Sequence, residues 1–416
     1  MKLVKISLTK DATINTAGTI ANAGLGLVFF VFLSRFLGPQ SFGIFAASQA
    51  ILVVLADVFD LGTNTGILHF LPKAKDDESF YNGIFKLAIL IKILAGLAVF
   101  LFGFLLANLI SNVVFKNQTY SQILTLSFLI LPTLLLGFST SVLYTKHKFF
   151  SAAVLNVISN LSRLALLGIL IIYNQVSIFS ALLVFSISPF FGFLISPLFF
   201  SFKPFFDGKI NWKLAKEFLS FNKWMSAAFS TAAVQARIDN LLLIKFSNSF
   251  ETGIYAAASR LLSIYMQIAG ALSTAYAPSF AKASNISEKQ QVFKSAFVIT
   301  SAFAFISLFP VIFSTKIIDI IYGSAYTKAV PSFQILYFGM FFVVLTVPAI
   351  TAIIYLFSKP VYYFFLTVLQ FLLTIIGNIF LIPKYGAVGA ALVFSANMLI
   401  LYSISTVYSF LKLGRN

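Results

Sequence analysis

The stretch FKPFFDGKINWKLAKEFLSF (residues 202–221) is the longest strongly polar interruption of an otherwise apolar sequence. Four lysines lie within it and a fifth follows directly: Lys203, Lys209, Lys213, Lys216 and Lys223. Long apolar segments lie on both sides of it, and the two sides resemble each other in sequence. We therefore interpret this stretch as a polar joint between two repeated halves of one membrane-embedded chain.

The composition of the chain argues against a water-soluble fold. Its 416 residues are 59% hydrophobic and only 10% charged, whereas soluble domains carry roughly 25% charged residues. So few charges cannot cover a water-facing surface, and lipid must therefore be the main solvent of this chain. The sequence predicts a multi-pass membrane protein.

Residue types and motifs exclude several kinds of site. The chain has no cysteine, which excludes disulfides, zinc–thiolate sites and cysteine nucleophiles, and its two histidines are too few for a histidine-based metal site. It also contains no phosphate-binding loop and no nucleophile elbow. We therefore expect no metal, no cofactor and no ATP hydrolysis by this chain.

Apolar segments long enough to cross a bilayer recur along the whole sequence. A transmembrane helix needs about 20 mainly apolar residues, and about twelve segments meet this length. They are residues 12–33, 43–69, 83–107, 122–144, 150–172, 178–201, 222–246, 252–278, 291–312, 330–356, 361–382 and 387–410. The predicted fold is therefore all-α.

The positive charges follow the pattern that sets membrane topology. The chain has 29 Lys+Arg against 12 Asp+Glu, a formal net charge of +17. With the N-terminus inside, about eighteen Lys and Arg residues fall in inner loops and about six in outer loops, as the positive-inside rule expects. This predicts that both termini are cytoplasmic, and it explains the basic charge without a nucleic-acid partner.

The polar joint itself carries a helical pattern. Ile210, Leu214, Phe218 and Phe221 recur at spacings of three to four residues, with lysines elsewhere around the helix. This pattern is typical of an amphipathic helix on the inner membrane surface, and a plain solvated linker is the alternative interpretation.

The two halves match at an offset of 210 residues. SRFLGPQSFGIFAASQAIL (34–52) aligns with IKFSNSFETGIYAAASRLL (244–262), pairing Gly43 with Gly253. Six spans separate the two copies, so they have the same orientation, as in transporters built from parallel repeats. Chance similarity between Ala- and Gly-rich helices is the alternative. The predicted organisation is an N-terminal six-helix lobe (1–201), a cytoplasmic amphipathic linker (202–221) and a C-terminal six-helix lobe (222–416).

Three stretches resemble a known family. FFVFLSRFLGPQSFGIFAASQAI (29–51), residues 236–282 and KYGAVGAALVFSANM (384–398) are similar to Wzx-type oligosaccharide flippases of the multidrug/oligosaccharidyl-lipid/polysaccharide (MOP) exporter superfamily. The resemblance implies two parallel six-helix bundles in a MATE-like fold in the cytoplasmic (inner) membrane. It also implies that an undecaprenyl-diphosphate-linked oligosaccharide moves between leaflets by alternating access, for surface polysaccharide biosynthesis. Glycosyltransferases and a polysaccharide polymerase would be its partners, besides the phospholipid membrane.

Ionisable residues inside membrane spans are costly and indicate function. Asn156, Asn160 and Arg163 share one helix face, as do Arg260, Ser263 and Gln267. Arginine suits the oxygens of a diphosphate, because its guanidinium is planar and always charged. The predicted substrate ligands are Lys92, Asn156, Asn160, Arg163, Arg237, Arg260 and Gln267, and the carboxylates available for ion coupling are Asp57, Asp60 and Asp239. Interhelical hydrogen bonds and structural salt bridges are the alternative roles for these side chains.

Two other functions fit a chain of this class. A multidrug or cation antiporter of the same superfamily would favour acidic residues in its cavity. Here the ionisable residues deep inside the spans are more often basic than acidic. A membrane-embedded glycosyltransferase or polymerase would need a long outer loop. No predicted loop exceeds about 20 residues, which is only the length of one transmembrane helix. We therefore expect a transporter and not an enzyme.

Overall fold

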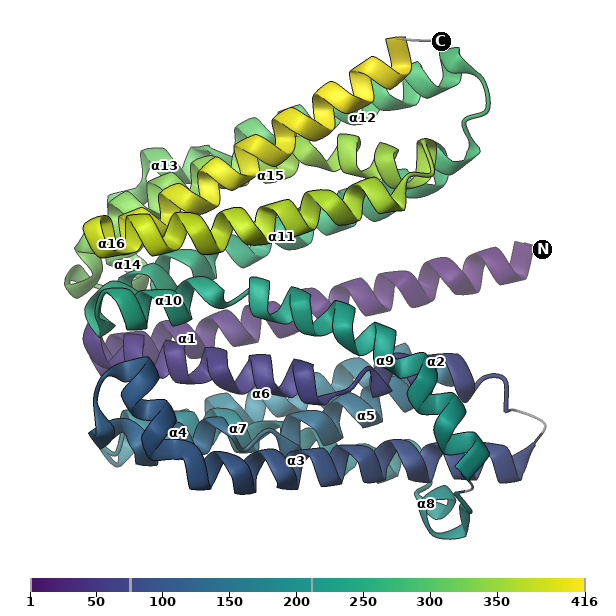
Figure 1. Ribbon diagram of the computed structural model, residues 1–416, viewed down its shortest axis with the longest axis vertical. Coiled ribbons are helices and arrows are strands. Elements are labelled where there is room, and N and C mark those ends of the chain that lie inside the picture. The colour runs from purple at the N-terminus through teal and green to yellow at the C-terminus, as the bar shows by residue number, and fades with distance from the viewer. Residues whose placement is uncertain (1, 75–76, 211, 415–416) are drawn as a thin grey trace. The chain divides into compact units, whose positions relative to one another are not determined.

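The computed structural model describes residues 2–74, 77–210 and 212–414, and nearly all of them are helical (Figure 1). Eight helical segments of this described part are long and apolar enough to cross a membrane. The prediction of an all-α, multi-pass membrane protein is therefore confirmed. The number of twelve transmembrane helices and the cytoplasmic position of both termini stay predictions.

Two long helices each contain one sharp change of backbone direction. In α1 (Lys2–Phe59), Gly38 has φ 69° and ψ 168° and precedes Pro39. In α16 (Pro360–Gly414), Gly386 has φ 55° and ψ −129°. Glycine adopts positive φ without the steric cost that other residues meet. Each kink lies where the sequence predicted a short loop between two spans.

The described residues divide into two compact units. Unit 1 contains the chain up to Leu37 and Ile44–Leu241, and unit 2 contains Gly38–Gly43 and the chain from Leu242 onward. The predicted lobe boundaries at residues 201 and 222 were drawn from membrane topology and stay predictions.

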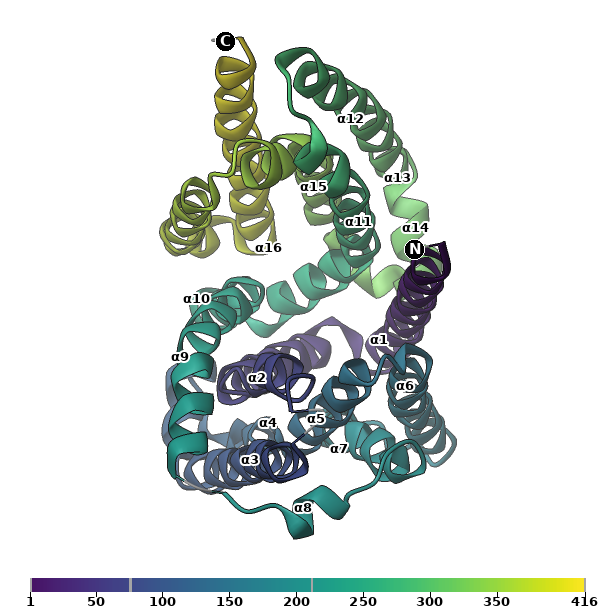
Figure 2. The ribbon, with the colours of Figure 1, turned by 90° about the vertical axis from the view of Figure 1, so that its right-hand side faces the viewer.

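Unit 1 is a bundle of helices that run alongside one another, as the nearly end-on view of Figure 2 shows for α3, α5, α6 and α7. After α1 it contains α2 (Thr63–Phe70), α3 (Glu78–Phe115), α4 (Ser121–Ser127), α5 (Leu131–Thr145), α6 (Phe149–Ile172), α7 (Ile178–Ile195), α8 (Lys203–Asp207), α9 (Trp212–Gln235) and the start of α10 (Ile238–Phe246). Its core gathers Ile67, Phe85, Phe138, Leu155 and Phe218.

The polar joint folds onto unit 1. The Lys86 ammonium donates a hydrogen bond to the Gly208 carbonyl at 3.0 Å and thereby ties the end of α8 to α3. In α9, Leu214 and Phe218 are buried in the core of unit 1, while Lys213 and Lys216 are exposed. The amphipathic pattern is thus present: protein covers Leu214 and Phe218 of its apolar side, whereas Ile210 is exposed.

Unit 2 contains α11 (Ser249–Lys282), α12 (Ile286–Ser307), α13 (Phe309–Ile312), α14 (Ser314–Tyr322), α15 (Val330–Thr351), a π-helical turn (Ala352–Leu356) and α16. The α11 residue Glu251 accepts a hydrogen bond from the Ala387 N–H at 2.8 Å, directly after the Gly386 kink. A carboxylate at this position satisfies one free N–H at the start of a helix.

The matched glycines of the sequence repeat contact each other within unit 2. A Cβ atom at Gly43 would meet the Ser249 carbonyl, and one at Gly253 would meet the Pro39 carbonyl. At the offset of 210 residues, Pro39 matches Ser249, so the two contacts are reciprocal.

The close approach at Gly43 predicts a large effect of a single methyl group. Gly43→Ala should destabilise the protein by about 1–3 kcal/mol, because the backbone of α11 must move to accept it. Gly26→Ala is the matched control, since nothing lies within 4 Å of a Cβ atom there. Thermal unfolding in detergent measures both variants, and equal melting temperatures would contradict this packing.

Candidate functional site

The chain breaks its helical path at residues 60–62. The helix α1 ends at Phe59, Leu61 and Gly62 have φ of 52° and 69°, and α2 begins at Thr63. The predicted continuous span 43–69 was therefore wrong at this point. Gly62 permits the left-handed backbone, and the backbone groups freed by the break need polar partners within the membrane.

A second break separates α9 from α10. Ala236 and Arg237 form a turn, in which the Arg237 N–H donates to the Val234 carbonyl at 3.1 Å. The predicted continuous span 222–246 was therefore also wrong. Arg237 sits at this break, and Asp60 sits at the other.

A cavity of about 390 Å³ opens beside both breaks, within unit 1. The α2 helix, which follows the first break, packs beside α9, which precedes the second (Figure 1). The cavity is lined by Asp57, Asp60, Asn64, Thr65, Phe229, Ala232, Ala233, Ala236 and Arg237. Three of the ten predicted site residues, Asp57, Asp60 and Arg237, are thus brought together.

A buried ion pair holds the first break in place. The fully buried Lys92 ammonium on α3 forms an ion pair with the Asp60 carboxylate and donates a second hydrogen bond to the Asn64 Oδ1 at 3.0 Å. Ser141 on α5 donates to the same Asn64 oxygen at 3.0 Å. The Asp60 carboxylate also accepts from the Thr63 hydroxyl and the Asn64 N–H, both at 3.2 Å. It therefore caps α2, at the helix end where a negative charge is favourable.

A second ion pair faces the cavity and is much looser. One Arg237 Nη1 lies 3.8 Å from the Asp57 Oδ2, a separation too long for a hydrogen bond. The two side chains are 32% and 47% exposed. Arg237 can therefore exchange Asp57 for another anion, whereas Lys92 is fully buried and the Asp60 side chain is only 14% exposed.

Arg163 lies in a different part of unit 1 and is not one of the cavity-lining residues. Its guanidinium lies 4.2 Å from the ring centroid of Phe185 and donates to the Asn160 Oδ1 at 3.1 Å. The Asn160 side chain donates in turn to Asn22 at 3.3 Å. The Asn156 amide donates to the backbone carbonyl of Ala152, on its own helix. The predicted polar face of α6 therefore exists, and its contacts join α6 to α1 and α7.

The remaining predicted site residues lie apart from the cavity. Asp239 is in the first turn of α10 and is not a lining residue. Arg260 and Gln267 are half-buried on α11, in unit 2. The Ser263 hydroxyl donates to the Arg260 carbonyl at 2.8 Å, so its hydrogen bond stays within α11. Their role as substrate ligands stays a prediction.

Sequence reasoning missed that Asn64 accepts a hydrogen bond from the buried Lys92 and that Ser141 donates to Asn64. Asn64 shares a helical spacing with Asp57 and Asp60, but Ser141 lies 77 residues further along the chain. The available signal was the sequence Asp60-Leu61-Gly62 inside an apolar segment. A glycine two residues after a charged residue, at membrane depth, indicates a helix break there.

The buried pair predicts a strong energetic coupling between Lys92 and Asp60. Lys92→Met alone should cost about 3–5 kcal/mol of stability, because it leaves a buried carboxylate without its cation. Asp60→Asn alone should cost a similar amount, and the double variant should recover much of the loss. Thermal unfolding of the four proteins in detergent gives the coupling energy.

Lys384→Met is a control for this cycle, since Lys384 is exposed and its loss should leave stability nearly unchanged. Losses in the double variant that equal the sum of both single losses would contradict a coupled pair.

Comparison with known proteins identifies the family. The family model described as polysaccharide biosynthesis protein matches residues 8–284. An uncharacterized membrane protein of Methanocaldococcus jannaschii is 23% identical over 297 residues, which cover 68% of this chain and 70% of that protein.

Solved structures share the fold. The lipid II flippase MurJ, in an inward closed conformation, superposes with a TM-score of 0.76 at 19% identity, over 96% of this chain and 90% of that one. An inward-facing MATE family multidrug resistance transporter of the MOP superfamily gives 0.74 at 12% identity, over 95% of both chains. A MOP superfamily transporter from Pyrococcus furiosus gives 0.62 at 12% identity, over 98% and 95%.

The fold is therefore the one found in MOP superfamily transporters, as the sequence resemblance implied. Because the family model covers well over half of the sequence, this chain belongs to the polysaccharide biosynthesis protein family.

Proposed function

We propose that this protein flips an undecaprenyl-diphosphate-linked oligosaccharide across the cytoplasmic membrane, for surface polysaccharide biosynthesis. The observation that carries the proposal is the family match over residues 8–284, which includes both helix breaks and all charged residues of the cavity. The shared fold with a lipid II flippase supports movement of a lipid-linked cargo. The two predicted lobes, 1–201 and 222–416, joined by the linker 202–221, would alternate access to it.

Arg237 is the residue that we assign to the diphosphate. Its guanidinium lies beside the cavity, and its contact with Asp57 is 3.8 Å long and partly exposed. A diphosphate offers several charged oxygens in a geometry that matches the guanidinium fork. The cargo can therefore displace Asp57 from Arg237 without breaking a well-formed hydrogen bond.

Asp57 is the carboxylate that we assign to ion coupling. When Arg237 turns to a diphosphate, Asp57 loses its counter-charge and becomes a site for a proton or a metal cation. Asp60 differs, because it stays paired with the enclosed Lys92 ammonium. Exchange of partners at Arg237 thus couples the uptake of an anionic cargo to the uptake of a cation.

The other predicted ligands would serve the same cargo elsewhere on its path. Arg163, Asn156 and Asn160 offer donors on α6, and Arg260 and Gln267 offer donors on α11. Lys92 would act through Asp60 and Asn64, whose oxygens it holds at the cavity.

A multidrug or cation antiporter is the second candidate. Two carboxylates, Asp57 and Asp60, line the cavity beside one guanidinium, and the fold matches a MATE multidrug transporter. An organic cation would pair with Asp57 and leave Arg237 without a partner. A membrane-embedded glycosyltransferase or polymerase receives no support from the matched families.

Reconstitution in proteoliposomes distinguishes the two candidates. The flippase should move a fluorescent lipid-diphosphate-linked oligosaccharide between leaflets and should leave organic cations such as ethidium where they are. Arg237→Ala should lower the initial rate roughly 10- to 100-fold, because one charge-assisted contact is lost. Arg237→Lys should keep part of the rate, since it retains the charge and loses the planar fork.

Arg35→Ala is the matched control, because Arg35 is an exposed arginine outside the cavity. Its rate should equal that of the unchanged protein. Ethidium transport with no movement of the lipid-linked sugar would reject the flippase and support the antiporter.

A further inference from the structure

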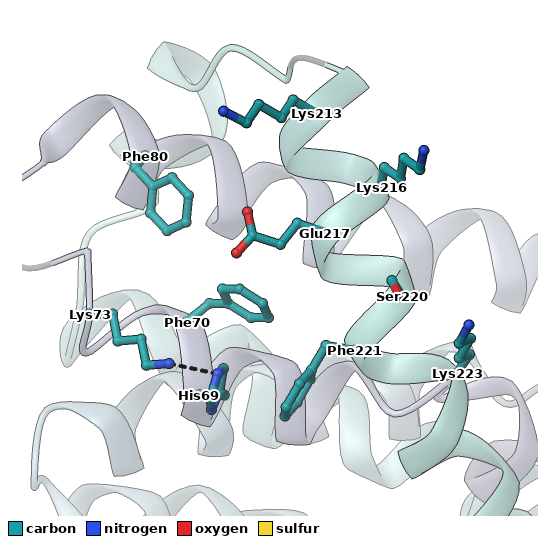
Figure 3. A pocket seen from close by; sticks show the side chains of 10 residues that line it. All are labelled: His69, Phe70, Lys73, Phe80, Lys213, Lys216, Glu217, Ser220, Phe221 and Lys223. Carbon is teal, nitrogen blue, oxygen red and sulfur yellow. Dashed lines mark hydrogen bonds between the residues drawn. The ribbon is translucent and has the colours of Figure 1, made fainter.

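A second, larger cavity lies at the start of α9, also within unit 1. It has a volume of about 760 Å³ and is open to the outside. Its walls come from the end of α2, the start of α3 and the first half of α9 (Figure 3). It is lined by His69, Phe70, Lys73, Phe80, Lys213, Lys216, Glu217, Ser220, Phe221 and Lys223.

One wall is a basic face of α9. Lys213, Lys216, Ser220 and Lys223 follow at intervals of three, four and three residues, which places them within about 80° around the helix. All three lysines are exposed. No carboxylate among the described residues forms a salt bridge with Lys213 or Lys216. This face therefore presents several cations to one ligand.

The opposite wall is organised by an aromatic stack. The His69 and Phe221 rings lie 4.3 Å apart between centroids at an interplanar angle of 16°. The Lys73 ammonium donates to the His69 Nε2 at 2.8 Å (Figure 3). Lys73 is thereby held at the cavity with two further N–H donors.

The charges of the cavity are strongly unbalanced. Its lining contains four lysines and one carboxylate, Glu217, and these five groups give a formal net charge of +3. Glu217 points toward the side of Phe70 and Phe80, while the ammonium groups of Lys216 and Lys223 lie on the outer flank of α9 (Figure 3). Like charges gathered at one site attract an anion, and flexible lysine stems let several of them reach it.

Apolar side chains border the basic face. Trp212 is 80% exposed and Leu219 is 44% exposed, and both fall next to the lysines around α9, on the side away from Phe221. Tryptophan beside lysine is typical of the depth at which lipid headgroups meet acyl chains. A ligand that suits both surfaces has an anionic head and an apolar tail.

We propose that the basic face of α9, at the rim of this cavity, binds the phosphate group of an anionic membrane lipid. The exposed lysines of α9 would hold the phosphate, and the lipid tail would lie along Trp212 and Leu219. Basic clusters at the membrane surface bind anionic headgroups in this way. The inference goes beyond the proposed function, because it concerns a resident lipid and needs no transported cargo.

The bound lipid would also restrain α9. Asn222 of α9 is 1% exposed and packs against Gly66 of α2. Neither polar atom of its side chain has a hydrogen-bond partner among the described residues. The Asn222 side chain therefore adds no hydrogen bond to this helix contact, and a phosphate held by the α9 lysines would add a polar restraint on α9.

Native mass spectrometry of the purified full chain tests the proposal. The protein should retain phosphatidylglycerol in preference to phosphatidylcholine. The double variant Lys213→Gln, Lys216→Gln should bind phosphatidylglycerol about 30-fold more weakly, because two of the basic contacts are lost. The double variant Lys282→Gln, Lys294→Gln is the control, since it removes two exposed lysines of unit 2 and should bind normally.

Equal retention by both double variants would overturn the proposal. Competition with inorganic pyrophosphate separates a lipid from a free phosphate: displacement of phosphatidylglycerol by pyrophosphate would assign the site to a soluble anion and reject the lipid. Hydrogen exchange adds a second readout, in which α9 should exchange faster in the Lys213→Gln, Lys216→Gln variant than in the control. The outcome is independent of the flipping assay, so either proposal can fail alone.

Discussion

The buried ion pair between Lys92 and Asp60 is the interaction on which the polar interior of unit 1 depends. A charged side chain at membrane depth is costly, and a helix that breaks there exposes backbone groups that lipid cannot satisfy. The Lys92 ammonium pairs with the Asp60 carboxylate and donates to the Asn64 side chain. The Asp60 carboxylate also accepts a hydrogen bond from the Asn64 backbone N–H, directly after the break. The pair keeps the start of α2 in place, and this position opens a cavity beside α9.

The two ion pairs of unit 1 differ in a way that separates stability from function. Lys92 is fully buried and in direct contact with Asp60, which is 14% exposed, whereas Arg237 and Asp57 are 32% and 47% exposed and 3.8 Å apart. A tight buried pair resists a change of partner, because removing one charge strands the other. A loose pair at a cavity can accept a competing anion with little loss. We therefore infer that the first pair stabilises the fold and that the second pair exchanges its partner for the cargo.

Much of the fold could be predicted from the sequence, because long apolar segments allow few structures in a membrane. The match of Gly43 with Gly253 was also visible, and the structure places these glycines against each other. The breaks at residues 60–62 and 236–237 were missed, since a turn of two or three residues hardly changes the hydropathy of a whole segment. The Asn160 contact of Arg163 lies on the predicted face of α6. The contacts of Lys92 with Asn64 and of Arg163 with Phe185 could not be predicted, because these partners lie on other helices and spacing relates only residues of one helix.

Calorimetric titration of a short polyprenyl diphosphate into the purified protein tests the exchange at Arg237 most directly. The account predicts that Asp57→Asn binds this ligand more tightly than the unchanged protein does, because Arg237 then has no competing carboxylate. It predicts that Arg237→Ala binds the ligand more weakly. Equal or weaker binding by Asp57→Asn, with the protein still folded, would contradict the claim that the diphosphate and Asp57 compete for Arg237.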